Sequence, residues 1–234
     1  MSIPKSNFFD EKIECLFGFC GIILTSFLII LAVLNTPDFN LLNTKVSDLG
    51  HGPAKAFFST GFVVGGCLAI PFFIYFEKNV LRKITIDKSL KVFGKIEVVK
   101  LTRGGAIFLS ILSSLCIALV GIIPDETHPT LFRVFHGIYA GVSFFGTALY
   151  ILLFSILLRR AQNFNFPKFL AYLGYVAFSA VPLMLILALF EFFALGEWIA
   201  AILLLLWLFL TSALLLFSKN IRDDIKKIQQ AVTK

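Results

Sequence analysis

Six long apolar stretches constrain the fold of this chain more than any other feature of its sequence. Each is long enough, at about 20 residues, to cross a ~30 Å hydrocarbon core as an α-helix. Lipid offers the backbone no hydrogen-bond partners, so such segments satisfy their own polar groups as helices. The sequence therefore predicts an all-α, polytopic membrane protein, with residues 1–234 forming a single bundle of six transmembrane helices. The predicted spans are residues 15–35, 56–76, 105–123, 131–158, 169–194 and 198–217.

The basic residues are distributed unevenly around these spans. If the N-terminus is cytoplasmic, only Lys45, Lys55 and Arg133 of the 21 lysines and arginines fall in outside segments. Cytoplasmic loops carry an excess of Lys and Arg, so this pattern predicts a multi-pass cell-membrane protein with cytoplasmic N- and C-termini. The formal net charge of +7 then reflects topology and attraction to anionic headgroups, and we expect no nucleic-acid partner.

The longest predicted cytoplasmic connection, residues 77–104, leaves three structures open. Alternating Ile84 and Ile86, and Ile96 and Val98, flank a polar turn and would suit a short β-hairpin. The same lysine-rich segment would also suit an amphipathic helix on the inner leaflet. The third alternative is a solvated basic loop that only sets the topology.

Small residues mark faces of two predicted helices. Gly61, Gly65 and Gly66 would let helix backbones approach closely, either within the bundle or in a homo-oligomer. In the fourth span, small and polar residues recur in steps of three and four, and we expect this stripe to face the bundle. The stripe consists of Arg133, His136, Gly137, Ala140, Ser143 or Phe144, and Thr147.

All three histidines lie on the predicted outer side, together with several acids. Ionisable groups near membrane depth are costly and usually face a cavity or a partner. A structural interpretation also exists, because Pro53 and Pro129 suit first helical turns and Asp48 suits an Asx turn. The segments that concentrate these groups are 46–53 and 120–136. The outer ionisable residues are His51, His128, His136, Asp38, Asp48, Asp125, Glu126, Glu191 and Glu197.

Two short motifs carry a family resemblance. The run Ser47-Asp48-Leu49-Gly50 precedes a glycine-rich span, and Gly121-Ile-Ile-Pro-Asp125 follows the third span. With these motifs the chain resembles a prokaryotic family of hypothetical membrane proteins known as domain of unknown function nine-nine-eight. This resemblance implies a six-span bundle without an established activity. A more distant likeness to DRAM-like and Sfk-like membrane proteins implies a lipid-related role.

A second resemblance concerns enzymes. The spacing of Ser47 and His51 is similar to that in the alkaline ceramidase and progestin-receptor-like membrane hydrolases, which cleave lipid amides with zinc. The resemblance implies that Ser47 is a polar helper and His51 a metal ligand. The chain departs from that family because its last two spans contain no histidine.

The residues themselves allow two kinds of catalytic site. His51 and His136, with Asp48 or Asp125, would supply nitrogen and oxygen ligands that suit zinc, the one cofactor we consider. Without metal, an Asp–His pair such as Asp125 with His128, or Asp48 with His136, would serve as general acid and base.

Three functions follow as hypotheses. The first is binding of a lipid or amphipathic small molecule at the outer leaflet, with Arg133 and His128 contacting the headgroup. The second is a membrane-embedded lipid hydrolase with Ser47, Asp48, Asp125 and His136 as catalytic residues. The third is a small transporter or channel, which the absence of a visible inverted repeat disfavours. Membrane lipids are the expected partners in the first two.

Overall fold

The computed structural model describes residues 8–81, 96–123, 130–160 and 167–218, and every regular element in these ranges is helical. Six helices are long and apolar enough to cross a membrane, which confirms the predicted six-span bundle. Short helical turns η1 (Ser47–Gly50), η2 (Gly52–Ala54) and η3 (Glu77–Leu81) accompany them. The long helices are α1 (Phe8–Leu34), α2 (Lys55–Phe76), α4 (Ile96–Ile122), α5 (Thr130–Arg160), α6 (Lys168–Ala188) and α7 (Phe193–Phe217).

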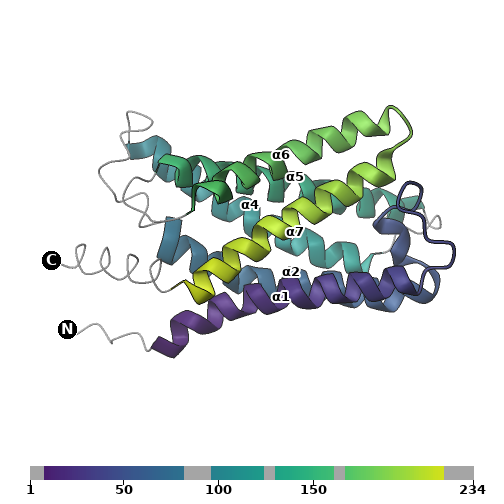
Figure 1. Cartoon of the computed structure of the whole chain (residues 1–234), viewed down its shortest axis with the longest axis horizontal. Helices are drawn as coiled ribbons and strands as arrows, with labels where there is room; N and C mark the ends of the chain where they lie inside the picture. The colour runs from purple at the N-terminus through teal and green to yellow at the C-terminus, as the bar shows by residue number, and fades with distance from the viewer. Residues whose placement is uncertain (1–7, 82–95, 124–129, 161–166, 219–234) are drawn as a thin grey trace.

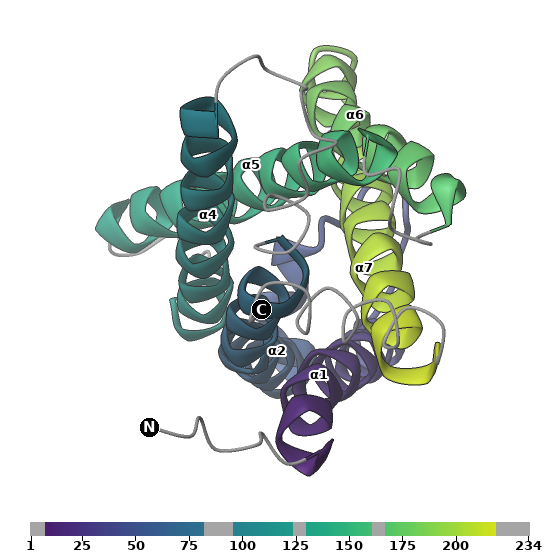
Figure 2. The same cartoon turned by 90° about the vertical axis from the view of Figure 1, so that its left-hand side faces the viewer.

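The helices form a closed ring in chain order, because α7 returns to pack against α1 (Figure 2). The start of α1 and the end of α7 lie at the same end of the bundle, which we call the terminal end (Figure 1). The opposite end carries the α1–α2 connection, residues 35–54, and the α6–α7 turn, residues 189–192 (Figure 1). We call it the loop end. The charge pattern predicts that it is the outer one.

An aromatic cluster fills the space between α2, α5 and α7. Trp207 is fully buried against Phe154, with their ring centroids 5.5 Å apart, and Phe154 lies 4.3 Å from Phe76. The Trp207 indole Nε1 donates a hydrogen bond to the Leu170 carbonyl of α6 at 3.0 Å, so its polar atom is satisfied despite burial. This side of the bundle is a packed core.

The glycines of α2 serve packing within the chain. Gly61 lies against Leu28 of α1, and the Thr25 hydroxyl of α1 donates to the Gly61 carbonyl at 3.1 Å. Gly66 faces α4, where a Cβ atom would lie 2.5 Å from the Ser114 carbonyl oxygen. The intramolecular interpretation of these glycines is therefore confirmed, and a homo-oligomer stays a prediction.

The boundary between the last two spans was predicted wrongly. Helix α6 ends at Ala188 rather than at residue 194, and α7 begins at Phe193 rather than at residue 198. Glu191 has φ 67°, and the Phe192 amide donates to the Leu187 carbonyl at 2.9 Å, which together form a Schellman turn. Apart from Glu191 the turn is apolar, so mean hydropathy did not reveal it. As a result Glu197 lies within a helix.

The predicted connection 77–104 is partly helical. Residues 77–81 continue α2 as the π-helical turn η3, and α4 already begins at Ile96. A hairpin arm over Ile96 and Val98 is therefore excluded, because helix formation uses the backbone groups that a strand would pair. Residues 82–95 lie outside the described part of the chain.

Candidate functional site

The motif Ser47–Gly50 forms a tight turn rather than an open catalytic constellation. The Asp48 carboxylate accepts a hydrogen bond from the Lys45 amide at 2.8 Å, and this contact holds the turn. Leu49 and Gly50 are buried, and Gly50 lies so close to Phe58 of α2 that a Cβ atom there would be 3.3 Å from its ring. This contact differs from the predicted Asx turn, because the carboxylate accepts from an amide three residues earlier and not two residues later.

His51 follows this turn and is exposed. Its Nδ1 atom lies 3.3 Å from the Asp48 carbonyl oxygen, which is a backbone contact and not an Asp–His carboxylate pair. Ser47 is half-buried in the same turn. The structure thus brings Ser47, Asp48 and His51 together as neighbours in one turn.

The turn is fastened to the start of α7 by two residues that were not among the predicted site residues. Glu197 is only 5% exposed, and its carboxylate accepts a hydrogen bond from the Val46 amide at 3.0 Å. Next to it, Trp198 Nε1 donates to the Thr44 carbonyl at 2.8 Å, and the Trp198 ring packs edge-on against Phe39 at 5.7 Å. We call these five residues the loop clasp.

Glu197 carried a sequence signal that was used only in part. An acid in a long apolar helix is costly to bury and therefore has a specific partner in most membrane proteins. The predicted spans place Glu197 with the outer acids between the fifth and sixth spans, where an acid needs no buried partner. The partner, the Val46 amide, is 151 residues away in the chain.

His136 is buried in α5, with 3% of its surface exposed. Its Nδ1 atom lies 2.7 Å from the Ile123 carbonyl oxygen at the end of α4, a distance that indicates an N–H donor. Within the described residues its Nε2 atom has no hydrogen-bond partner. His136 therefore joins the ends of α4 and α5, which gives it a clear structural role.

The predicted polar stripe of α5 is confirmed only in part. His136, Ser143 and Thr147 are buried, as expected of a face directed into the bundle. Arg133 and Gly137 are exposed, so the outer part of the stripe was predicted wrongly. The first turns of α5 pass the edge of the bundle, where fewer neighbouring helices cover them.

The candidate metal ligands within the described residues do not form a metal site. Asp125 and His128 lie outside the described residues. Among the residues that are described, no three His, Cys, Asp or Glu side chains are close enough to hold a metal ion. The zinc set of His51, His136 and Asp48 is therefore not assembled, whereas the set that uses Asp125 stays a prediction.

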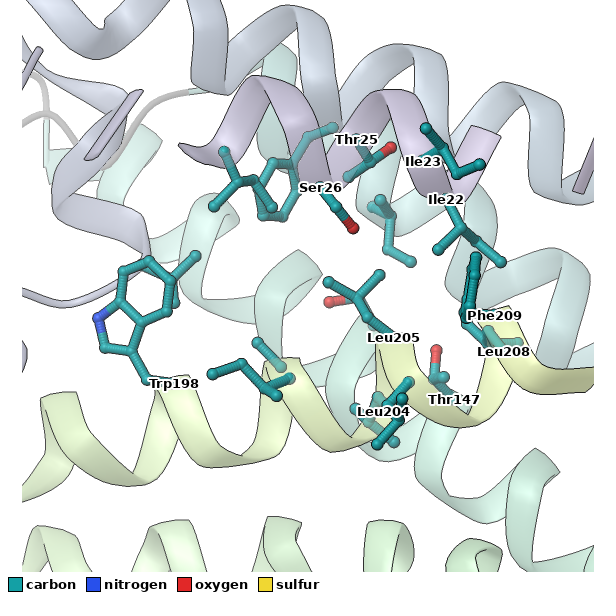
Figure 3. Close-up of a pocket in the computed structure, with 18 of the residues that line it drawn as sticks. Ile22, Ile23, Thr25, Ser26, Thr147, Trp198, Leu204, Leu205, Leu208 and Phe209 are labelled. Carbon is teal, nitrogen blue, oxygen red and sulfur yellow. The ribbon is translucent and has the colours of Figure 1, made fainter. Parts of the chain in front are cut away.

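A cavity of about 640 Å³ lies beside the loop clasp, between α1 and α7 (Figure 3). Three residues of α5, one of α2 and one of α4 close its far side, and Val46 and Trp198 of the loop clasp lie at its loop end. Its lining includes Ile22, Ile23, Thr25, Ser26, Phe27, Ile29, Ile30, Val46, Phe62, Ile117, Ser143, Phe144, Thr147, Trp198, Ala201, Ile202, Leu204, Leu205, Leu206, Leu208 and Phe209.

The lining is apolar apart from four hydroxyl groups. Two of these are hydrogen-bonded, because Thr25 donates to the Gly61 carbonyl of α2 and Ser143 donates to the Ala140 carbonyl of its own helix at 2.8 Å. The other two belong to Ser26 and Thr147. None of the described lining residues has an ionisable side chain. The cavity is therefore suited to hydrocarbon rather than to a charged group.

The cavity opens sideways, between α1 and α7. The two helices touch near the terminal end, where Phe19 of α1 stacks on Phe209 of α7 at 5.4 Å, and they diverge toward the loop end (Figure 1). In the diverging part, Phe27 and Ile30 of α1 and Ile202 of α7 line the cavity and are each more than half exposed. We call this opening the α1–α7 window.

Comparisons of the chain with protein-family models, with curated proteins and with solved structures returned no match. The family resemblances suggested by the Ser47–Gly50 and Gly121–Asp125 motifs therefore stay predictions.

Proposed function

We propose that this membrane protein binds a lipid or another amphipathic small molecule in the cavity between α1 and α7. The observation that carries the proposal is the cavity itself, an apolar space of about 640 Å³ that opens sideways through exposed apolar residues. Small-molecule sites in proteins typically measure about 300–1,000 Å³ and are lined mainly by apolar side chains. Size and lining thus both suit a hydrocarbon-bearing ligand.

The position of the opening favours a ligand that comes from the membrane. The α1–α7 window lies within helices that are long and apolar enough to span a bilayer, so its rim would face lipid and not water. At the loop end, the loop clasp lies across the space between α1 and α7 through hydrogen bonds from Val46 and Trp198. With the loop end outermost, as the charge pattern predicts, the cavity belongs to the outer leaflet.

The catalytic hypotheses receive less support. Ser47, Asp48 and His51 make local contacts of a turn, and none of them lines the cavity. A hydrolase would need its nucleophile and base near the bound ligand. For this reason we propose ligand binding rather than catalysis.

Tryptophan fluorescence tests the proposal, because the chain has two tryptophans in different surroundings. Trp198 lines the cavity, whereas Trp207 is fully buried in the aromatic cluster. In nanodiscs that contain a lipid with brominated chains, bromine quenches a tryptophan that it approaches closely. The Trp207→Phe variant reports on Trp198 alone, and Trp198→Phe reports on Trp207 alone. We expect strong quenching of Trp198 and little of Trp207.

A cavity-filling variant separates a bound lipid from the lipids that surround any membrane protein. Ala201 lines the cavity on α7, so Ala201→Phe should remove most of the quenching of Trp198. Ser26→Phe fills the same space from α1, and it replaces Ala201→Phe in the experiment if that variant does not fold. The matched control is Val176→Phe, on the exposed face of α6 away from the cavity. Quenching that survives both fillings would contradict the proposal.

A further inference from the structure

We infer that the cavity holds a hydrocarbon chain of a lipid from the leaflet at the loop end, inserted through the α1–α7 window with the lipid's polar end beside the loop clasp. This inference rests on the proposed function and specifies the class of ligand, its orientation and its route of entry.

The length of the cavity matches the depth of one leaflet. On α7 its lining runs from Trp198 to Phe209, a rise of about 16 Å at 1.5 Å per residue. Half of a ~30 Å hydrocarbon core is about 15 Å. The cavity starts at the loop end, so it covers the hydrocarbon depth of that leaflet and stops near the middle of the membrane.

The two ends of the cavity differ in a way that orients an amphipathic ligand. The deep end is formed mainly by hydrocarbon side chains such as Leu208 and Phe209, with the Thr147 hydroxyl beside them (Figure 3). The loop end carries Trp198, and tryptophan prefers the membrane–water interface, where one part of its ring is apolar and its N–H is polar. Lys45 and Asp48 lie in the adjacent turn, within the segment that the loop clasp holds. The terminal methyl group of a lipid's hydrocarbon chain therefore suits the deep end, and the lipid headgroup suits the loop end.

The window is bounded at both ends, which favours entry from the side. Toward the terminal end, Phe19 packs against both Phe209 and Phe217, each at 5.4 Å. Toward the loop end, Glu197 and Trp198 fasten the turn at residues 44–46 across the gap. Between these closures the rim consists of exposed Ile, Phe and Leu side chains, over which a lipid chain can slide without loss of apolar contact.

Lipids brominated at different depths test the orientation. One reporter is Trp198 in the Trp207→Phe variant. The second is Phe209→Trp in a chain that also carries Trp198→Phe and Trp207→Phe, which places the only tryptophan at the deep end. We expect the lipid brominated near its headgroup to quench Trp198 more than the lipid brominated near its chain methyl does. For the Phe209→Trp reporter we expect the reverse order.

Each outcome has a distinct meaning. The same order at both reporters, or an order opposite to the expected one, would overturn the orientation while leaving lipid binding intact. Quenching that is insensitive to Ala201→Phe and to Ser26→Phe at both reporters would defeat the proposed function itself. Failure of the inference and failure of the proposed function are therefore distinguishable.

The rate at which quenching appears tests the route. When nanodiscs exchange lipid with brominated vesicles, the paired substitution Ile23→Phe and Ile202→Phe narrows the window and should slow the onset of Trp198 quenching. Val176→Phe with Leu185→Phe, on exposed positions of α6, is the matched control and should leave the rate unchanged. An unchanged rate in the window variant, with a faster onset in Glu197→Ala, would show entry at the loop end and overturn lateral entry.

Discussion

Trp198 and Trp207 lie on the same helix and use the same chemistry in opposite surroundings. Each donates its indole N–H to a backbone carbonyl of another element, Thr44 at 2.8 Å and Leu170 at 3.0 Å. Trp207 is surrounded by the aromatic cluster, whereas Trp198 has a cavity on one side. The comparison shows that α7 has two parts. The part around Trp207 completes a packed core, and the face that runs from Trp198 to Phe209 forms one wall of a cavity.

The difference follows from the neighbours of α7 rather than from α7 itself. Around Trp207, the space is filled by Tyr150 and Phe154 of α5, and Phe76 of α2 packs against both of these rings. Toward the loop end, α1 diverges from α7 and the facing residues, such as Ser26 and Ala201, are too small to fill the gap. Packing stabilises the part of α7 around Trp207. Hydrogen bonds to the connection between α1 and α2 position the part around Trp198.

Replacing each tryptophan by alanine should give the largest difference in stability between the two parts of α7. We expect Trp207→Ala to lower the free energy of unfolding by about 3–5 kcal/mol, because it opens a void in a packed core. Trp198→Ala should cost less, about 0.5–3 kcal/mol, because one side of that ring already borders open space. Denaturant unfolding of both variants in one detergent measures the difference. Equal losses would show that the two halves are packed alike.

Added volume should have opposite effects on the two halves. Gly174 lies against the packed half, where a Cβ atom would crowd Ser155 Oγ and lie 2.9 Å from Trp207 Nε1. Gly174→Ala should therefore destabilise the protein by about 1–3 kcal/mol. Ala201→Phe should be tolerated, because it grows into the cavity. Gly104→Ala is the control, since its Cβ atom would meet nothing within 4 Å among the described residues. A destabilised Ala201→Phe with a neutral Gly174→Ala would reverse the comparison.

Removing the Glu197 carboxylate should loosen the loop half alone. Glu197→Ala leaves the buried Val46 amide without its acceptor, at a cost of about 1–3 kcal/mol. Hydrogen exchange should accelerate at residues 44–50 and stay unchanged around Trp207. Glu197→Gln keeps an acceptor oxygen and should retain most of the protection. Faster exchange spread evenly over the bundle would mean that the clasp supports the whole fold.

Replacing either of the two described histidines by alanine should lower the free energy of unfolding least, and His136→Ala should lower it more than His51→Ala. His136→Ala loses the contact with the Ile123 carbonyl, so we expect a loss of about 0.5–1.5 kcal/mol. His51→Ala changes an exposed side chain in the turn, and its effect should stay within about 0.5 kcal/mol. Thermal unfolding of the two variants side by side measures both. A larger loss for His51 would indicate a role beyond the turn.

The sequence was sufficient for the number and type of the helices, because hydropathy over about 20 residues directly reflects membrane thickness. It was insufficient at the α6–α7 turn, since three of the four residues 189–192 are large and apolar and the left-handed Glu191 backbone has no hydropathy signal. The prediction that the α5 stripe faces the bundle was correct where neighbouring helices surround it, at Ser143 and Thr147. It failed at Arg133, where they do not.

The candidate site was less accessible to prediction. The sequence indicates the polar residues around Ser47, but the bond between Val46 and Glu197, which fastens their turn to α7, is encoded by no local pattern. The cavity depends on the divergence of α1 and α7, and a crossing of two distant helices cannot be read from either helix alone. Its lining residues look like ordinary membrane-facing positions in the sequence.

The ring in which α7 closes onto α1 has a consequence for the biogenesis of the protein. The ribosome delivers α1 long before α7, and the Val46 amide is made 151 residues before the carboxylate that binds it. Until α7 inserts, the turn at residues 44–48 lacks its clasp and the cavity lacks one wall. Synthesis proceeds from the N-terminus. A chain arrested before α7 would therefore contain five of the six long helices and lack the α7 wall of the cavity.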